Sequence, residues 1–288
     1  MPYDFGIHPN MPMAEYVGGK LCRGSDFPYA LGRSNLKTIV ILSPLHAKRD
    51  IESTEDDNTR ASDLGTVCHD LALEKNDRIV WIDAKNYQTK KAQELRDEAY
   101  ELGKMPLLKR EEKKVNGMVK AIRAELEKFG KLQVEHTLLW RDPVTQLVCK
   151  SRLDALACDM GTIIDVKTTK SAAPRSYEKI IYKQWHDVQM AHGAAGIAEL
   201  TGIAPTEWVW VVCEDEEPFC TSTIYASDLA METGARRRAL GMNRWRKCID
   251  AGEWPGYDRQ SYLEPPEWVK EHLIREENEN EAGIYQRA

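Results

Sequence analysis

The segment from Leu147 to Lys170, LVCKSRLDALACDMGTIIDVKTTK, constrains the fold of this chain more than any other part. It is rich in branched apolar residues and predicts two β-strands, at about 147–157 and 162–168. The turn Asp159-Met160-Gly161 joins them, because Gly accepts a positive φ. We therefore expect the rest of the chain to be organised around a β-hairpin at this place.

Charged residues stand in this hairpin where a buried strand would normally exclude them. Asp165 and Lys167 are two positions apart, so both side chains point to one face of the strand. Asp154 lies on the preceding strand and can approach Asp165 across the hairpin. Two carboxylates side by side repel each other, and a divalent metal such as Mg²⁺ removes that cost. A lysine beside the metal can orient water and stabilise negative charge, so the cluster is suited to metal-assisted phosphodiester hydrolysis. The alternative is a plain Asp–Lys salt bridge on an exposed strand.

The same residues resemble the signature of a nuclease superfamily. Asp154 followed by Asp165-Val166-Lys167 is similar to the PD-(D/E)xK motif. The flanking segments resemble the RecE-type (exodeoxyribonuclease VIII) branch, which is common in prophages. They are GTVCHDLALE at 65–74, SRLDAL at 151–156, IIDVKTTKSA at 163–172, Gln189 and EWPGY at 253–257. The resemblance covers the chain from about Ser34 to Tyr257, and five weak motifs in the expected order make it fairly specific.

The resemblance implies a fold and a set of site residues. The fold is an α/β domain with a central mixed β-sheet flanked by helices, the restriction-endonuclease-like core, and the order of the predicted helices and strands indicates the same α/β domain. The ligands for one or two Mg²⁺ ions, with Mn²⁺ as a substitute, are His69, Glu135, Asp154, Asp165 and the backbone carbonyl of Val166. Lys167 orients or activates the attacking water, and Gln189 positions Lys167 or a DNA phosphate.

Two of these residues have a plain structural explanation when the sequence alone is considered. His69 lies in a predicted helix, 64–73, and could be a structural histidine beside its apolar face. Glu135 lies in a predicted strand, 133–140, and could be a surface acid. The chain also departs from the family pattern Q-x-x-x-Y, because Gly193 stands at the Tyr position. His192 precedes it, and we expect it to take over part of the role of that Tyr.

The activity implied by the resemblance is that of a Mg²⁺-dependent exonuclease. Such an enzyme degrades one strand of linear duplex DNA from its 5′ end, forms a ring-shaped oligomer (a trimer or tetramer), and works with a RecT-type annealing protein in phage-type recombination. One alternative is a structure-specific or restriction-type endonuclease with the same core. Another is a nuclease-derived module that binds DNA ends without cutting, although the complete set of acids and lysine argues against it.

Composition adds limits but no rival chemistry. The chain has 288 residues, a net charge of −6 and 42% hydrophobic residues, which is typical of a globular protein without an overall basic character. Its seven cysteines are scattered without a C-x-x-C pair, which predicts reduced thiols and a cytoplasmic location. A predicted helix, 228–251, carries clustered cations that are either a solvated face or a phosphate-contacting face. They are Arg236, Arg237, Arg238, Arg244, Arg246 and Lys247.

We expect a single nuclease domain over 1–288. It consists of an irregular N-terminal arm (1–33), a nuclease core (34–257) and a polar C-terminal tail (258–288). The remaining predicted elements follow from apolar periodicity. They are helices at 35–42, 86–104, 109–129 and 185–201, strands at 76–82, 206–212 and 219–225, and a polar loop at 52–63.

Overall fold

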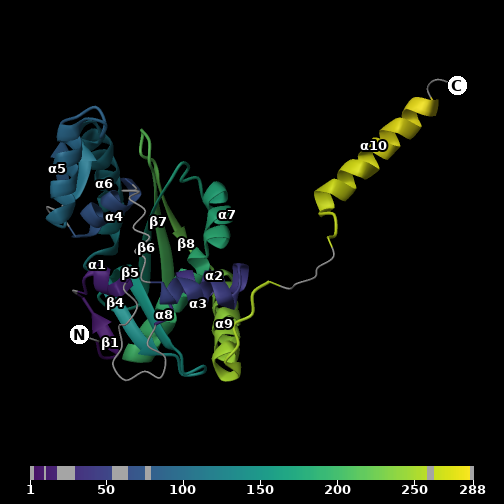
Figure 1. The fold of residues 1–288 in the computed structure, drawn as a ribbon, viewed down its shortest axis with the longest axis horizontal. Coiled ribbons are helices and arrows are strands. Elements are labelled where there is room, and N and C mark those ends of the chain that lie inside the picture. Colours follow the sequence, from purple (N-terminus) through teal and green to yellow (C-terminus); the bar gives the residue numbers. More distant parts are fainter. Residues whose placement is uncertain are drawn as a thin grey trace. The chain divides into compact units, whose positions relative to one another are not determined.

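The computed structural model describes residues 3–9, 11–17, 30–53, 64–74, 79–257 and 263–285. The chain divides into two compact units, Met1–Pro255 and Gly256–Ala288. The first unit is an α/β fold, and Figure 1 labels its elements. Its helices are α1 (Met13–Val17), α2 (Arg33–Ile41), α3 (Pro44–Glu52), α4 (Leu64–Glu74), α5 (Lys90–Glu101), α6 (Glu112–Leu126), α7 (Pro174–Gln184), α8 (His186–Thr201) and α9 (Asp228–Ala251).

The strands of the first unit form two sheets. They are β1 (Gly6–His8), β2 (Ile79–Ile82), β3 (Met105–Leu108), β4 (Leu132–Arg141), β5 (Val148–Ala157), β6 (Thr162–Thr169), β7 (Glu207–Glu214) and β8 (Thr221–Tyr225). The main sheet has six strands in the order β1-β4-β5-β6-β7-β8, and β2 and β3 pair separately. All neighbours in the main sheet are antiparallel except β6 and β7, which are parallel. This is the central mixed sheet that the sequence predicts.

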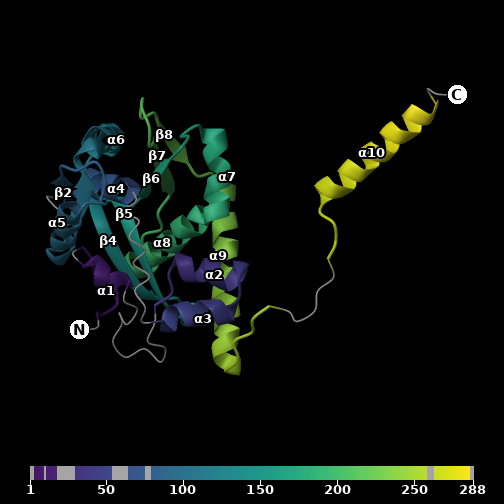
Figure 2. The ribbon, with the colours of Figure 1, turned by 45° about the horizontal axis from the view of Figure 1, so that its top comes forward.

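Helices cover both faces of the main sheet, as Figures 1 and 2 show. On one face, α4 and α6 pack against the sheet, and on the other α8 does, with α2 and α9 behind it. Neighbouring residues of β6 divide between the two layers: Ile163 belongs to the apolar core on the α8 side and Ile164 to the core on the α6 side. Because successive strand residues point to opposite faces, a strand buried on both sides is apolar at nearly every position.

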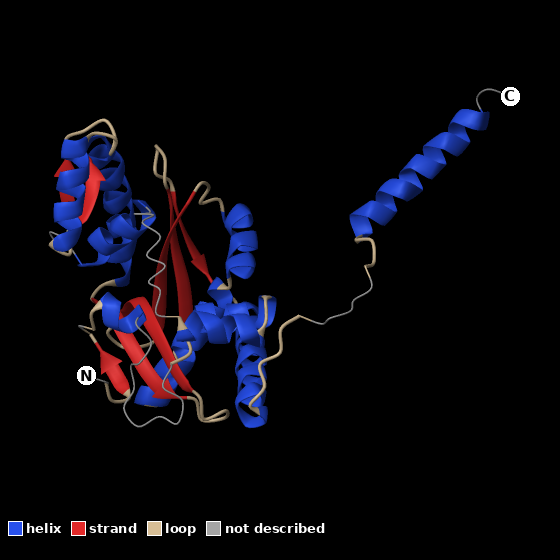
Figure 3. Ribbon diagram, viewed as in Figure 1, coloured by secondary structure: helices blue, strands red, loops and turns tan. Residues whose placement is uncertain are grey.

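The main sheet opens between β5 and β6. These strands pair only at Ala155 with Ile164 and at Leu156 with Ile163. Beyond this short ladder they run apart, and Figure 3 shows β4 and β5 diverging from β6 and β7. Asp154 and Asp165 are the next residue of each strand after the ladder. The hairpin thus places both acids at the point where the sheet forks.

Some segments differ from the sequence prediction. The arm at 1–33 contains β1, which pairs with β4, and α1; a strand of three residues is too short to show an alternating pattern. Strand β3 was not predicted, because it contains Pro106, a residue that usually argues against a strand. The predicted helix 86–104 is shorter, since α5 covers Lys90–Glu101. Most of the predicted loop 52–63 lies outside the described residues.

The second unit, Gly256–Ala288, contains one described helix, α10 (Glu267–Tyr285). The sequence predicts a polar C-terminal tail here and does not indicate its secondary structure. Charged residues such as Glu and Lys are good helix formers, which accounts for the helix. Of all the helices that the described residues form, none has the length and apolar character needed to cross a membrane.

Candidate active site

Three carboxylates meet where the sheet forks. Asp154 on β5 and Asp165 on β6 are 8% and 3% exposed, and Glu135 on β4 is 5% exposed. The register of β4 and β5 sets Glu135 opposite Asp154, between the pairs Val134–Ala155 and His136–Leu153. Glu135 has a φ of 55°, which is unusual for a residue other than Gly. Such backbone strain gathers at functional sites, where the surrounding structure maintains it.

His69 on α4 connects two of these carboxylates. Its Nε2 lies 2.9 Å from Oδ2 of Asp154, and its Nδ1 lies 3.5 Å from Oε1 of Glu135. Burial acts to lower the pKa of His69, but the charge and hydrogen bond of Asp154, together with Asp70 and Glu135, outweigh it and raise the pKa to about 10. The imidazolium therefore neutralises the acids in this arrangement. A metal ion bound by His69 would have to displace that proton.

Lys167 and Gln189 hold Asp165 from two elements. Lys167 Nζ donates to Oδ1 of Asp165 at 2.6 Å, and Gln189 Nε2 on α8 donates to the same oxygen at 2.8 Å. Burial raises the pKa of Asp165 to about 6. Burial has the same tendency at Asp154, but the positive charges of His69 and Lys167 hold the pKa of that carboxyl below its usual range. The two acids thus have different proton affinities although they are neighbours.

The donor set fits a hard divalent cation. Oε1 of Glu135 and Oδ2 of Asp165 are buried and have no hydrogen-bond partner among the residues that the structure describes. A buried carboxylate oxygen without a partner is costly, and a metal ion would satisfy it. Donor atoms of His69, Asp70 and Glu135 lie within 4.8 Å of one another. Carboxylate oxygens with an imidazole are ligands that Mg²⁺ or Mn²⁺ accepts.

Each residue that the sequence predicts for the site lies at this fork. His69, Glu135, Asp154, Asp165, Lys167 and Gln189 are joined through the contacts above. The carbonyl of Val166, also predicted as a ligand, accepts from Lys167 Nζ at 3.3 Å, and the Val166 N–H donates to Oδ2 of Asp154 at 2.8 Å. The fork therefore uses both backbone groups of Val166.

Two residues of the site were missed by the sequence analysis. Arg152 forms an ion pair with Glu135 and donates to the carbonyl of Met11 at 2.8 Å. Asp70 lies beside His69, with its Oδ1 3.5 Å from Nδ1 of that ring. A signal for Arg152 was present, because it precedes Asp154 by two positions and so shares its strand face. Nothing in the sequence distinguishes Asp70 from an ordinary helix acid.

A cleft of about 400 Å³ opens onto these residues. Its lining residues come from strands β4 and β5, from helices α1, α4 and α8 and from the start of α2. The residues that line it are Met13, Tyr16, Gly32, Arg33, Ser34, Asn35, His69, Glu135, Lys150, Ser151, Arg152, Asp154 and Gln189.

The comparison with known families agrees with this geometry. A family described as "PDDEXK-like domain of unknown function (DUF3799)" matches residues 33–264. The chain belongs to this PDDEXK-like family. No curated protein matches the sequence.

Solved structures show the same fold. A protein from Eubacterium rectale, described as a candidate exonuclease, is similar with a TM-score of 0.55 and 12% identity, over 84% of this chain and 92% of that chain. At this identity the likeness concerns the fold alone. The protein SSO0001 is more distant, with a TM-score of 0.30 and 13% identity over 62% of this chain and 85% of its own, and carries no argument.

The sequence predicts that His192 takes over part of the role of the tyrosine in the family pattern Q-x-x-x-Y. This prediction is wrong. His192 is 1% exposed, donates from Nε2 to the carbonyl of Leu31 at 3.1 Å and accepts from Arg238 at Nδ1 at 3.0 Å. It is therefore a structural histidine. A Cβ at Gly193 would lie 2.7 Å from Cδ2 of Leu153, so a side chain there would require Leu153 to shift.

The phosphate-contacting interpretation of α9 also loses most of its cations. Arg237 donates twice to the buried carboxylate of Asp187, at 2.7 and 2.8 Å. Arg238 donates to Asp142 at 2.5 Å. Arg236 and Arg246 form ion pairs with acids of their own helix, Glu232 and Asp250 respectively. These arginines form ion pairs with carboxylates of the protein itself.

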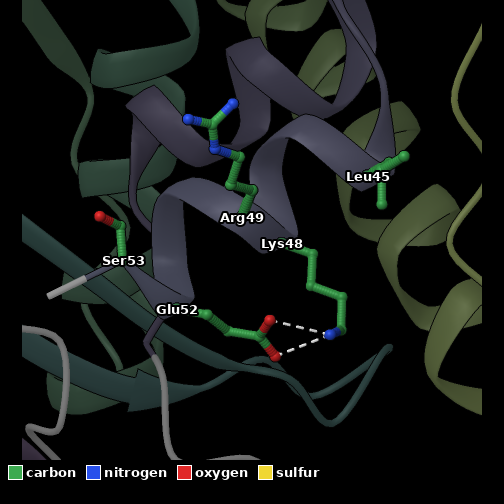
Figure 4. A pocket seen from close by; sticks show the side chains of 5 residues that line it. All are labelled: Leu45, Lys48, Arg49, Glu52 and Ser53. Carbon is green, nitrogen blue, oxygen red and sulfur yellow. Dashed lines mark hydrogen bonds and ion pairs between the residues drawn. The ribbon is translucent and has the colours of Figure 1, made fainter.

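A second hollow lies along α3 and contains no comparable chemistry (Figure 4). Its lining residues are Leu45, Lys48, Arg49, Glu52 and Ser53. Lys48 and Glu52 form an ion pair of 2.8 Å one helical turn apart, which is a common arrangement on a solvated helix. With one acid, already paired, this group of residues cannot hold a metal as the fork can.

Proposed function

We propose that this protein is a metal-dependent exodeoxyribonuclease that acts on the ends of linear double-stranded DNA. One observation carries the proposal. Asp154, Asp165 and Lys167 meet where β5 and β6 part, with His69 and Glu135 beside them and two carboxylate oxygens that lack hydrogen-bond partners. The resemblance to the RecE-type branch supports the choice of DNA ends and of degradation from the 5′ end.

The residues of the fork have separate tasks. Glu135, Asp154, Asp165 and His69, with the Val166 carbonyl, would hold Mg²⁺ or Mn²⁺. When bound, the ion lowers the pKa of water and neutralises charge on the phosphate. Burial acts to lower the pKa of Lys167, but the charges of Asp165 and Asp154 outweigh it and raise the pKa, so the side chain stays cationic at neutral pH. Lys167 therefore orients the attacking water and stabilises negative charge, rather than removing a proton.

Gln189 has a positioning task in this proposal. Its amide NH₂ shares Oδ1 of Asp165 with Lys167, and its own Oε1 is buried without a hydrogen-bond partner. The residue belongs to α8, whose apolar residues pack in the core, so its position is fixed by the fold. In this proposal it holds the carboxylate of Asp165 in place together with Lys167, while Gln189 itself lines the cleft.

The test is hydrolysis of linear duplexes labelled at either the 5′ or the 3′ end, with Mg²⁺ or with a chelator, beside a covalently closed circle. We expect mononucleotides released from the 5′-labelled end with Mg²⁺ and an intact circle. Cutting of the closed circle would favour the alternative, an endonuclease with the same core. Binding of ends without cutting under any divalent metal would favour the non-cutting module.

The proposal extends to the assembly. By the RecE-type resemblance we propose a cytoplasmic homo-oligomeric ring, a trimer or tetramer, that threads the DNA end and cooperates with a RecT-type annealing protein in recombination. Light scattering of the purified protein measures the mass of the particle. A monomer at micromolar concentration contradicts the ring.

A further inference from the structure

Three cations of α2 and α7 lie near one another, and one of them, Arg33, lines the cleft. Arg33 is at the start of α2, and it lines the same cleft as His69, Asp154 and Gln189. Lys37 is one turn further along α2, on the same side of the helix as Arg33. Both reach Gln184, the last residue of α7: Arg33 Nη1 donates to its carbonyl at 3.1 Å, and Lys37 Nζ donates to its Oε1 at 2.9 Å. Lys183, exposed, precedes Gln184. We name Arg33, Lys37 and Lys183 the rim cations.

The rim cations are not neutralised by acids. Within the described parts of the chain, no carboxylate lies within 4.0 Å of any of the three, and Gln184 offers only neutral oxygens. The pKa of Lys37 is lowered, first by burial and then by the positive charges of Arg33, Arg237 and Lys183. Because Arg237 has its own partner in Asp187, the excess positive charge belongs to the rim cations.

Helix capping explains only part of this arrangement. Cations near the C-terminus of a helix interact favourably with its dipole, and this accounts for the bonds of Arg33 and Lys37 to Gln184. It does not account for three cations of one sign gathered near one another. Like charges placed together are unfavourable unless an anion joins them. By contrast, four arginines of α9 each pair with a carboxylate, namely Arg236, Arg237, Arg238 and Arg246.

We propose that the rim cations bind a backbone phosphate of the DNA strand that enters the cleft, at a nucleotide other than the one that is cut. This inference rests on the proposed function for the identity of the polymer. A planar guanidinium and two ammonium groups suit phosphate oxygens, and such contacts fix the register of the strand without reading its sequence. The scissile phosphate belongs to the fork, because the carboxylates and Lys167 are there.

The experiment measures the binding of a fluorescent linear duplex over a range of salt concentrations, with Ca²⁺ replacing Mg²⁺ and gels verifying that the DNA stays intact. It compares the wild type with the double variant Arg33→Ala/Lys37→Ala. The matched control is Arg236→Ala/Lys170→Ala, which also removes two positive charges, each exposed and paired with an acid. A charge-keeping variant, Arg33→Lys/Lys37→Arg, tests whether the charge or the exact side chain matters.

We expect the double alanine variant to bind about tenfold or more weakly at about 150 mM salt, and its slope of log affinity against log salt to fall by about two. The control and the charge-keeping variant should stay near the wild type. Equal affinity and slope in wild type and the double alanine variant would overturn the proposal. So would an equal loss in the charge-keeping variant, since the effect would then be structural, and so would a wild type that does not bind DNA.

The result is independent of cutting. A wild type that binds the duplex through the rim cations but never cuts it contradicts the proposed exonuclease and leaves the phosphate contact standing. A wild type that cuts, with a double alanine variant of unchanged affinity and salt slope, contradicts the phosphate contact alone.

Discussion

Gln189 donates its side-chain amide to Oδ1 of Asp165 at 2.8 Å, although the two residues come from a helix and from the strand beneath it. The same oxygen accepts from Lys167 at 2.6 Å, while Oδ2 is buried without a hydrogen-bond partner. The two oxygens of one carboxylate are thus divided: one is held by the protein, and the other is available to a metal. Hydrogen bonds from neighbouring side chains commonly orient metal ligands in this way.

Replacement of Lys167 tests whether the fork is catalytic. Lys167→Ala should lower the single-turnover rate of duplex hydrolysis by about a hundredfold or more, as for the loss of one electrostatic group. Metal and DNA binding should be nearly unchanged, because the lysine acts on water and developing charge. Lys167→Arg should rescue poorly, since a guanidinium has a different shape from an ammonium.

Lys170→Ala is the matched control for this prediction. Lys170 follows on the same segment, but its side chain is 80% exposed and pairs with Asp215. Its removal should leave the rate unchanged. If Lys167→Ala cuts as fast as the wild type, the lysine is only a salt-bridge partner of Asp165 and the catalytic interpretation of the hairpin is lost.

Replacement of Asp165 tests the metal site directly. Asp165→Asn keeps the shape of the side chain but removes the charge, so calorimetry should show Mg²⁺ or Mn²⁺ affinity lowered by at least about tenfold. Asp159→Asn is the control, because Asp159 lies exposed in the turn of the same hairpin, where its carboxylate accepts from the Gly161 N–H. Equal metal affinity in wild type and Asp165→Asn would remove Asp165 from the ligand set.

Local patterns were sufficient to predict the fold class and the centre of the site. Consecutive apolar residues predict that β6 is buried on both faces, and alternating apolar and polar residues predict strand β4. The spacing of Asp165 and Lys167 places both on one face of a strand. Asp154 follows from hairpin pairing. Each of these inferences spans few residues, which is where sequence periodicity is informative.

Partners far apart in the chain could not be predicted. Arg238 meets Asp142, 96 positions away, and Arg237 meets Asp187, 50 positions away. Nothing near either arginine indicates a carboxylate, so a row of cations on a helix looks available for phosphate. The rim cations show the reverse: Arg33 lies 151 positions from Gln184, and the fold brings it to Gln184 and so to Lys183, the preceding residue.

The close packing of Gly193 gives a prediction on stability. A Cβ at this position would lie 2.7 Å from Cδ2 of Leu153, beneath α8. Gly193→Ala should therefore lower the free energy of unfolding by up to about 2 kcal/mol, which is the usual cost of overpacking less the gain of about 1 kcal/mol from replacing Gly inside a helix, and restoring the family's tyrosine should cost more. Urea unfolding measures this. Glu199→Ala, on the exposed side of the same helix, should change it by less than about 0.5 kcal/mol. If Gly193→Ala is as stable as the wild type, Leu153 on β5 can move aside at little cost.

His192 connects three parts of the chain by hydrogen bonds that require its neutral form. It donates from Nε2 to the carbonyl of Leu31 and accepts at Nδ1 from Arg238, which also holds Asp142. A second proton would have to occupy Nδ1, facing a guanidinium. Burial first, and then the charge of Arg238, lowers the pKa of His192 to about 3.

This geometry predicts how stability depends on pH. The folded pKa of His192 lies below the unfolded value of 6.5, so the unfolded chain takes up the proton first as the pH falls. The stabilising contribution is complete above about pH 6.5 and is lost progressively toward pH 3, by about 2 kcal/mol at pH 5.

His192→Asn, which keeps a donor and an acceptor but does not titrate, should lose about 2 kcal/mol less than the wild type between pH 7 and pH 5 in urea unfolding. His186→Asn should remove a similar share, because burial also lowers the pKa of His186 to about 3. The same pH dependence in His192→Asn and the wild type would mean that His192 takes up its proton without unfolding.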